Sequence, residues 1–429
     1  MLAWGARKAG GGDVESLRLL SVLFAAAAAA LTSIWALRLL DDPLAAGLTG
    51  LLVALGSAPV QYAEQLRAYA LVVLMAVMFG MVLVEAALRP KARLFVGLAA
   101  CAWVGALTHY FFLFVVAAGL VWLWIARPRP VAAGRATVAI GVGMLAFAPW
   151  LPAFHEQEAH GRYRWIGGFD PTAVVKLPGE LFFGPDGLLF GIARLAVTVA
   201  LIGGVVVLSR QREGCVVVAL GLLPIAAAAG LWAAGAPIFN ERNMLPVVPF
   251  LAIAVAATLR ELPPRLLTAG ALVGIAATVA GAAYAQATLG RVAYDSVART
   301  ITDFGWTAGD AVVVGYLRPS GDRRGVGIQI ASPLGWYLPG RPDLVWSPAR
   351  RGCRVRFAVE QVPDAQAWLA RYDGRVSAAR IFAYYDHPIL GRPRDKLVVV
   401  RFHSPTRVSG AFFYAVGRKV SCRSGAASR

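Results

Sequence analysis

Three short polar segments interrupt a mostly apolar chain, and each contains side chains that bind anions or transfer protons. Their candidate residues are Glu64, Arg67 and Tyr69, then His109 and Tyr110, and finally Glu241 and Arg242. A guanidinium group donates two parallel hydrogen bonds to a phosphate, and a neutral imidazole can shuttle a proton or bind a phosphate. The three segments therefore predict an anion-binding site, provided that the fold brings them together.

Each segment also has a plainer interpretation, which the residues alone leave open. The first segment fits an aromatic belt at a membrane interface, with Glu64 and Arg67 as a surface pair. In the same way His109 fits an interfacial filler, and the charges of Glu241 and Arg242 fit an anchor that fixes the topology. The two interpretations differ in whether the helices that carry these residues bring them together.

Residues 153–187 are a longer polar stretch with two further candidates, Arg162 and Arg164. With their aromatic neighbours they could hold an anionic or sugar ligand by charge and stacking, or anchor the chain at the interface. The stretch also contains His155 and His160, but this spacing sets two imidazoles about 500° apart around a helix rather than on one face. We therefore predict a solvated loop and no metal site there.

Several familiar motifs are missing from the sequence. It contains no glycine-rich phosphate loop of the Walker type, no nucleophilic serine elbow and no dinucleotide fingerprint. ATP-driven transport and dehydrogenase chemistry therefore have no support, and no cofactor is predicted with certainty.

The composition of the 429 residues is that of a membrane protein. Hydrophobic residues make up 58% and charged residues 15%, with a mean hydropathy of +0.62, whereas soluble chains have about 25% charged residues. Four cysteines are too few for a disulfide-rich module. Ten apolar runs approach the length of about 20 residues that crosses a bilayer. They lie near residues 18–39, 44–61, 68–88, 93–108, 110–126, 135–152, 188–208, 215–234, 243–260 and 264–284.

The basic residues of the loops predict the orientation of these spans. One alternating set of loops contains 11 Lys and Arg, and the other set contains five in more residues. Because cytoplasmic loops carry the excess of Lys and Arg, the first set is predicted to be cytoplasmic. The loops that contain Arg67, His109 and Arg242 are then outside, together with residues 153–187.

The start of the chain does not fit this topology by itself. Ten spans with an external C-terminus place the N-terminus outside, yet no signal peptide precedes residue 16. The simplest hypothesis is that a longer version carries another helix and an external loop upstream.

The last third of the chain has a different character. Residues 285–429 contain 22 Lys and Arg against 10 Asp and Glu, which is +12 of the net +18. Helices are predicted at residues 292–304 and 363–372, and strands at 311–316, 376–384 and 397–403. Alternating helices and strands indicate a small α/β domain. Cys353 and Cys422 lie in it and could form a disulfide outside the cell.

The sequence therefore predicts an all-α polytopic membrane bundle with a small C-terminal extracytoplasmic α/β domain. Its parts are an N-terminal segment of residues 1–16, a transmembrane domain of residues 17–284 and the α/β domain of residues 285–429. The basic tail is expected to meet anionic lipid headgroups or polyanionic envelope glycans rather than nucleic acid.

Four motifs, in this order, resemble those of the C-type, polyprenyl-phosphate-sugar-dependent membrane glycosyltransferases of the protein O-mannosyltransferase and aminoarabinose-transferase superfamily. They are Leu17-Arg18 with Ser21, the segment 61–71 matching at Arg67, Tyr69, Ala70 and Leu71, the turn Thr108-His109-Tyr110, and Glu241-Arg242 with Leu245-Pro246. The likeness spans residues 16 to about 260. The chain departs from the pattern where Glu64-Gln65 reverses the family's Gln-Glu pair, and where Asn243 replaces a tyrosine.

The resemblance implies a mechanism. In the family an aspartate of the first external loop deprotonates an acceptor, which attacks the anomeric carbon while the lipid phosphate departs with inversion. This chain begins beyond that loop, so the catalytic residue is unknown and the 429-residue form is expected to turn over little. Arg67 and Arg242 are expected to stabilise the phosphate.

The prediction for function is thus a glycosyltransferase of a bacterial inner membrane that moves a hexose or pentose from a polyprenyl-phosphate donor to an envelope glycan, lipid or protein. The leading alternative is a transporter or flippase of lipid-linked glycans, although transporters place charged groups near the middle of the membrane. A catalytically inactive envelope scaffold is the third possibility.

Overall fold

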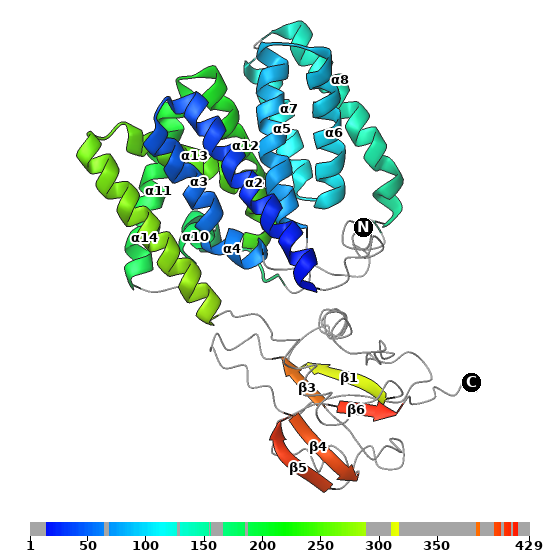
Figure 1. Ribbon diagram of the computed structural model, residues 1–429. Coiled ribbons are helices and arrows are strands. Elements are labelled where there is room, and N and C mark those ends of the chain that lie inside the picture. The colour runs from blue at the N-terminus through cyan, green and yellow to red at the C-terminus, as the bar shows by residue number, and fades with distance from the viewer. Residues whose placement is uncertain are drawn as a thin grey trace. The chain divides into compact units, whose positions relative to one another are not determined.

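The computed structural model describes residues 14–63, 68–126, 129–153, 155, 166–184 and 188–288, and five strands between residues 310 and 418 (Figure 1). The chain divides into two compact units, Met1–Gln286 and Ala287–Arg429. Each unit is described by itself.

In its described residues, the first unit is a bundle of α-helices with two short 3₁₀ helices. Its elements are α2 (Val14–Leu40), α3 (Pro43–Leu55), α4 (Ser57–Ala63), α5 (Tyr69–Leu88), α6 (Ala92–Thr108), α7 (Phe112–Ala126), α8 (Pro130–Phe147), η1 (Ala148–Trp150), α10 (Pro171–Phe183), α11 (Leu188–Ser209), α12 (Arg212–Ala233), η2 (Glu241–Val247), α13 (Val248–Arg260) and α14 (Pro264–Thr288).

Seven of the described helical stretches are long and apolar enough to cross a membrane, which makes the chain a multi-pass membrane protein. The predicted span 44–61 is divided into α3 and α4, which meet at an angle of 48° and count as an eighth span if taken together. Helices α6 and α7 have the predicted turn at His109 between them but are shorter, with 17 and 15 residues. The number of ten spans therefore stays a prediction.

Local sequence explains the break between α3 and α4. The carboxylate of Asp42 accepts a hydrogen bond from the N–H of Ala45, and Pro43 occupies the first turn, so α3 begins there. Gly56 ends α3 in an extended conformation, and the closely placed ring of Pro59 follows in α4. The chain therefore changes direction at Gly56, and α4 carries Tyr62 in its last turn.

Large apolar side chains fill the centre of the bundle, and others cover its outside. Phe79, Phe112, Phe182 and Phe250 are fully buried. The outer surfaces of α8, α11 and α14 instead expose many leucine, isoleucine and valine side chains, as expected of helices that face lipid.

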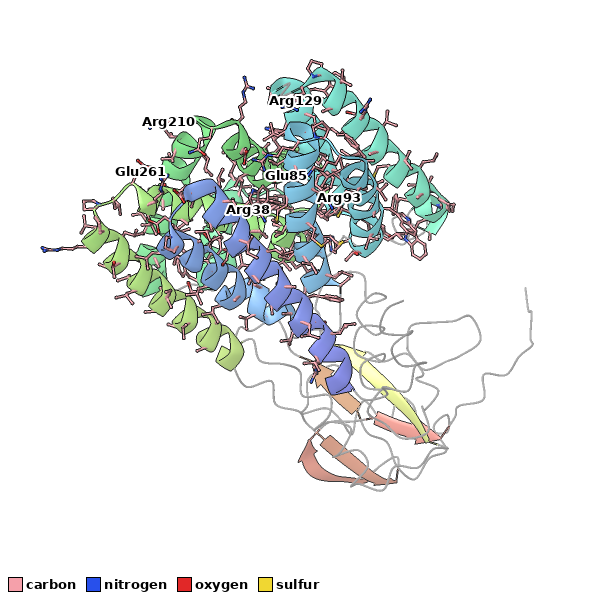
Figure 2. All side chains as sticks on the ribbon, turned by 45° about the horizontal axis from the view of Figure 1, so that its top comes forward. Arg38, Glu85, Arg93, Arg129, Arg210 and Glu261 are labelled. Atoms are coloured by element: carbon pink, nitrogen blue, oxygen red, sulfur yellow. The ribbon has the colours of Figure 1, made fainter. Side chains whose placement is uncertain are left out.

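Charged residues gather at one end of the bundle. Figure 2 shows Arg38, Glu85, Arg93, Arg129, Arg210 and Glu261 at the ends of the helices there. Tyr69 begins α5 and Glu85 lies near the end of α5, so these two residues mark opposite ends of one long helix. The predicted outer segments therefore lie at the other end of the bundle.

The stretch of residues 153–187 contains a helix that the sequence analysis did not expect. Asp170 caps α10 by accepting from the N–H of Thr172, and Pro171 occupies its first turn. Leu177, Leu181 and neighbouring phenylalanines bury the inner face of α10 against α4 and α11. The signal was present in the Asp-Pro pair and in the spacing of the apolar residues.

The second unit is described only through its strands. β1 (Asp310–Tyr316) pairs in parallel with β3 (Ala383–Asp386) and antiparallel with β6 (Ala415–Arg418), while β4 (Val399–Ser404) and β5 (Arg407–Phe412) form an antiparallel pair. β1 matches the strand expected at residues 311–316. The expected helices, Cys353 and Cys422 lie outside the described residues, so the α/β domain stays a prediction.

Candidate functional site

Parts of the chain far apart in the sequence meet at the end of the bundle opposite the arginine-rich loops. They are the start of α5, the turn between α6 and α7, and η2, which packs against α4, α5 and α12. The structure thus brings together Tyr69, His109, Glu241 and Arg242 from the three predicted segments. The predicted anion site needed these segments to meet, and in the fold they do.

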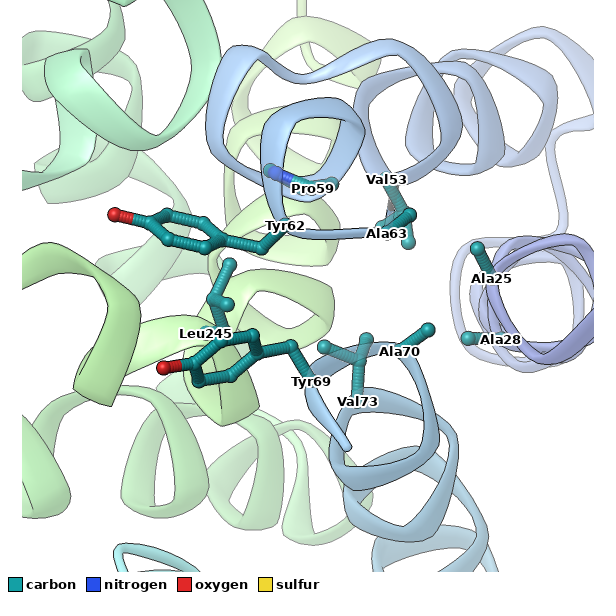
Figure 3. A pocket seen from close by; sticks show the side chains of 10 residues that line it. All are labelled: Ala25, Ala28, Val53, Pro59, Tyr62, Ala63, Tyr69, Ala70, Val73 and Leu245. Atoms are coloured by element: carbon teal, nitrogen blue, oxygen red, sulfur yellow. The ribbon is translucent and has the colours of Figure 1, made fainter. Parts of the chain in front are cut away.

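A row of aromatic rings connects α4, α5 and the turn after α6. The Tyr62 and Tyr69 rings meet edge to face with centroids 5.1 Å apart, and the Tyr69 and His109 rings lie 5.6 Å apart. Both tyrosines are buried, at 8% and 6% exposure. Figure 3 shows their hydroxyl groups pointing in the same direction, away from Ala25 and Ala28 of α2.

One hydrogen bond joins the two polar segments that are farthest apart in the sequence. The hydroxyl of Tyr62 donates to Oε1 of Glu241 at 2.8 Å. Glu241 is partly exposed, and a hydrogen bond to a carboxylate is stronger than one between neutral groups. Tyr62 therefore fixes the orientation of Glu241.

The backbone around Glu241 is also held in place. The Asn240 side chain accepts from the N–H of Arg242 and caps η2. The buried Asn243 donates to the carbonyl of Ile238 at 2.8 Å. Asn243 thus connects η2 to the segment just before it.

His109 has a defined tautomer and stays neutral near neutral pH. Its Nδ1 accepts a hydrogen bond from the backbone N–H of Phe111 at 3.3 Å, so the proton of the neutral ring lies on Nε2. Burial, and then the nearby positive charge of Arg242, lower the pKa of His109 to about 4. At pH 7 the ring can donate one hydrogen bond but carries no charge.

Arg242 contributes a positive charge to this site. The guanidinium group is close enough to act electrostatically on Tyr62, His109 and Glu241. It is partly exposed, so a ligand can reach it.

Tyr110 faces a different neighbour. Its hydroxyl accepts a hydrogen bond from Nε1 of Trp150 at 3.0 Å, which ties the turn to the end of the α8 segment. The predicted residues Glu64, Arg67, Arg162 and Arg164 lie outside the described part of the chain.

A small apolar cavity lies behind the two tyrosine rings (Figure 3). It has a volume of about 20 Å³ and is lined mainly by alanines of α2, by Val53 and Val73, and by Leu245 of η2. A water molecule needs about 10–15 Å³ and several polar partners. The cavity has room for about one water but a mostly apolar lining, so it is too small to hold a lipid phosphate or a sugar.

An aromatic cluster supports η2 from α12. The rings of Trp232 and Phe239 stack with centroids 5.3 Å apart, and Phe169 meets Trp232 edge to face at 5.2 Å. Nε1 of Trp232 donates to the carbonyl of Gly167 at 2.9 Å. The loop before α10 is thereby fixed next to the start of η2.

Sequence reasoning did not choose Tyr62, Trp150 or Asn240 as site residues. Tyr62 lies seven residues before Tyr69, and only the break between α3 and α4 turns it toward η2. Within the described ranges, no three His, Cys, Asp or Glu side chains come together as metal ligands.

These features define a multi-pass helical membrane fold with an arginine-containing polar site at one end. No family model and no curated protein matches the chain. Its fold is similar to that of ArnT from Cupriavidus metallidurans in the apo state, with a TM-score of 0.55 at 13% identity over 99% of this chain and 87% of ArnT.

A second structure of the same protein has undecaprenyl phosphate bound. That structure matches with a TM-score of 0.51 at 14% identity, over 80% of this chain and 74% of ArnT. At this level of identity, the similarity establishes the fold.

Proposed function

We propose that the chain is a membrane glycosyltransferase that takes a sugar from a polyprenyl-phosphate donor. The observation that carries the proposal is the meeting of Arg242, His109 and Tyr69 at one end of an ArnT-like bundle. Undecaprenyl phosphate binds to ArnT, and the motifs of this chain resemble those of the polyprenyl-phosphate-sugar-dependent glycosyltransferases. A cation beside a neutral hydrogen-bond donor suits the phosphate of such a lipid.

The reaction follows from the chemistry of a glycosyl phosphate. The acceptor oxygen or nitrogen forms a bond to the anomeric carbon, the bond from that carbon to the phosphate oxygen breaks, and the acceptor proton passes to a base. The lipid phosphate leaves with an added negative charge, which Arg242 stabilises in a site of low dielectric. Arg67 is proposed to act with Arg242, and the base is left unassigned.

The distribution of charge supports an external site. Since the arginine-rich end of the bundle is the cytoplasmic end by the positive-inside rule, the site faces the extracytoplasmic side. The proposed location is a bacterial inner membrane, and the proposed acceptor is an envelope glycan, lipid or protein.

Sugar transfer by the purified full chain tests the proposal. The probe is radiolabelled polyprenyl-phosphate sugar with cell-envelope extract as acceptor. Arg242→Ala is expected to lower transfer by about 100-fold, the usual effect of removing one preorganised charge-stabilising group. Arg210→Ala, at the opposite end of the bundle (Figure 2), is the matched control and is expected to retain transfer. Equal transfer by wild type and Arg242→Ala would refute the assignment.

The break between α3 and α4 supports a second candidate function. Discontinuous helices beside polar residues are typical of transporters, and α4 carries Tyr62 into the site. A flippase would move a fluorescent lipid-linked sugar between the leaflets of a vesicle without transferring the sugar. This result, with no transfer in the first assay, would favour the transporter.

A further inference from the structure

The carboxylate of Glu241 is held in one orientation, and in the described part of the chain one hydrogen bond to it is seen, from Tyr62. Its Oε1 accepts from Tyr62, whose ring is itself fixed against Tyr69. An ionised carboxylate accepts through two oxygens, with about four lone-pair positions. Glu241 is partly exposed, so a ligand can donate hydrogen bonds to the other lone-pair positions of the carboxylate.

Arg242 is the neighbour of Glu241 in the chain and acts on its carboxylate electrostatically. Glu241 and Arg242 are consecutive residues of a 3₁₀ helix, in which successive side chains point about 120° apart. The site therefore presents an acceptor and a cation as two separate functional groups.

This pair is selective for one kind of ligand. A bare phosphate beside Arg242 would be repelled by the negative charge of Glu241. A phosphate that carries a group with hydrogen-bond donors can place those donors against Glu241 instead. A glycosyl phosphate has this arrangement, because sugar hydroxyl or ammonium groups lie next to the phosphate.

We propose that Glu241 is the sugar-recognition residue of the site, accepting a hydrogen bond from a hydroxyl or ammonium group of the donor sugar, and that Tyr62 is its positioning residue. This inference rests on the proposed function, because it assigns the phosphate to Arg242. It predicts opposite effects on two related lipids when Glu241 is neutralised.

Equilibrium binding to the purified full chain in nanodiscs tests the inference with three probes: undecaprenyl phosphate, undecaprenyl phosphate glucose and undecaprenyl phosphate glucosamine. Glu241→Gln is expected to weaken binding of both sugar-bearing lipids about tenfold, because a charge-assisted hydrogen bond is lost. Binding of undecaprenyl phosphate itself is expected to stay unchanged or become tighter. A larger loss for glucosamine identifies an ammonium group as the donor, and equal losses identify a hydroxyl.

Tyr62→Phe keeps the ring and removes the hydroxyl, so it tests the positioning role. This variant is expected to bind the sugar-bearing lipids about threefold to tenfold more weakly and to bind undecaprenyl phosphate with unchanged affinity. A purely structural defect would weaken all three probes together. Glu85→Gln, which removes a carboxylate at the opposite end of the bundle, is the matched control and is expected to change none of them.

The possible failures are distinct. In one outcome, Glu241→Gln and Tyr62→Phe reduce the binding of all three lipids equally or of none, while Arg242→Ala reduces the binding of all three. The role of Glu241 in sugar recognition is then wrong, and the proposed function still holds. If the wild type binds no undecaprenyl lipid, both are wrong. Should Glu241→Gln fail to fold, Tyr62→Phe and Glu241→Asp decide by the same comparison.

Discussion

Tyr62 and Glu241 are separated by 179 positions in the chain, and a hydrogen bond of 2.8 Å connects them. At the scale of single residues, this bond explains why the site has a definite geometry. It links the break in the α3–α4 segment to η2, where the Asn240 cap fixes the backbone beside Arg242. The aromatic rings of Tyr69 and His109 pack against each other beside this bond.

The pKa of His109 predicts how stability depends on pH. The folded protein keeps this ring neutral down to about pH 4, whereas the unfolded chain binds a proton near pH 6.5. The contribution of His109 to stability is therefore fully present above pH 6.5 and is lost as the pH falls toward 4. His109→Gln is expected to reduce the fall in melting temperature between pH 6.5 and pH 4.5. An unchanged pH dependence would contradict the low pKa.

Trp150 is expected to stabilise the turn that carries His109 and Tyr110. Trp150→Phe removes the N–H that donates to Tyr110 at 3.0 Å, at a cost of about 1 kcal/mol. Thermal unfolding in detergent measures this cost. Trp103→Phe, at a tryptophan that is 42% exposed, is the control, and an equal effect in both variants would exclude a specific role for the hydrogen bond.

The candidate residues could be chosen from the sequence because charged and polar groups are costly in an apolar chain. Their partners could not be chosen in this way. Tyr62 and Trp150 are ordinary interfacial aromatic residues in the sequence, and only three-dimensional proximity gives their polar atoms a partner. Tyr110, predicted as a ligand-binding residue, has Trp150 as a hydrogen-bond partner, and its role in binding stays a prediction.

At the scale of elements, small residues determine how closely the helices approach. Gly204 of α11 faces the backbone of Ala254 in α13, where an added methyl group would overlap the carbonyl. Most of the long helices could be predicted from the sequence, since apolar runs of bilayer length have few alternative structures. The sequence analysis missed α10 because the surrounding residues are polar and the apolar face of α10 is short.

Two glycines of α11 provide a matched test of this packing. Gly204→Ala is expected to destabilise the bundle by about 1–3 kcal/mol, because the helices must separate. Gly191→Ala, where the added group would meet nothing within 4 Å, is expected to be neutral or slightly stabilising. Melting temperatures of the two variants in the same detergent give the comparison. Similar losses in both would contradict the close contact between α11 and α13.

At the scale of the whole molecule, the membrane accounts for the separation of the two ends. The loops with excess Lys and Arg lie at one end of the bundle and the candidate site lies at the other. The class of fold was predictable, because composition and periodicity report burial in lipid. The arrangement of the second unit was less predictable, since its strands are short and the order β3-β1-β6 joins strands that are far apart in the sequence.

We propose that the polar end of the bundle binds the phosphate of a polyprenyl lipid. Photocrosslinking of undecaprenyl phosphate that carries a diazirine in its first isoprene units, followed by peptide mapping, tests this claim most directly. The expected products lie in the segments around Tyr69, His109 and Arg242, and excess unlabelled undecaprenyl phosphate suppresses them. Labelling that is spread over the lipid-facing surfaces of α8 and α14 and that the unlabelled lipid does not suppress would contradict the account.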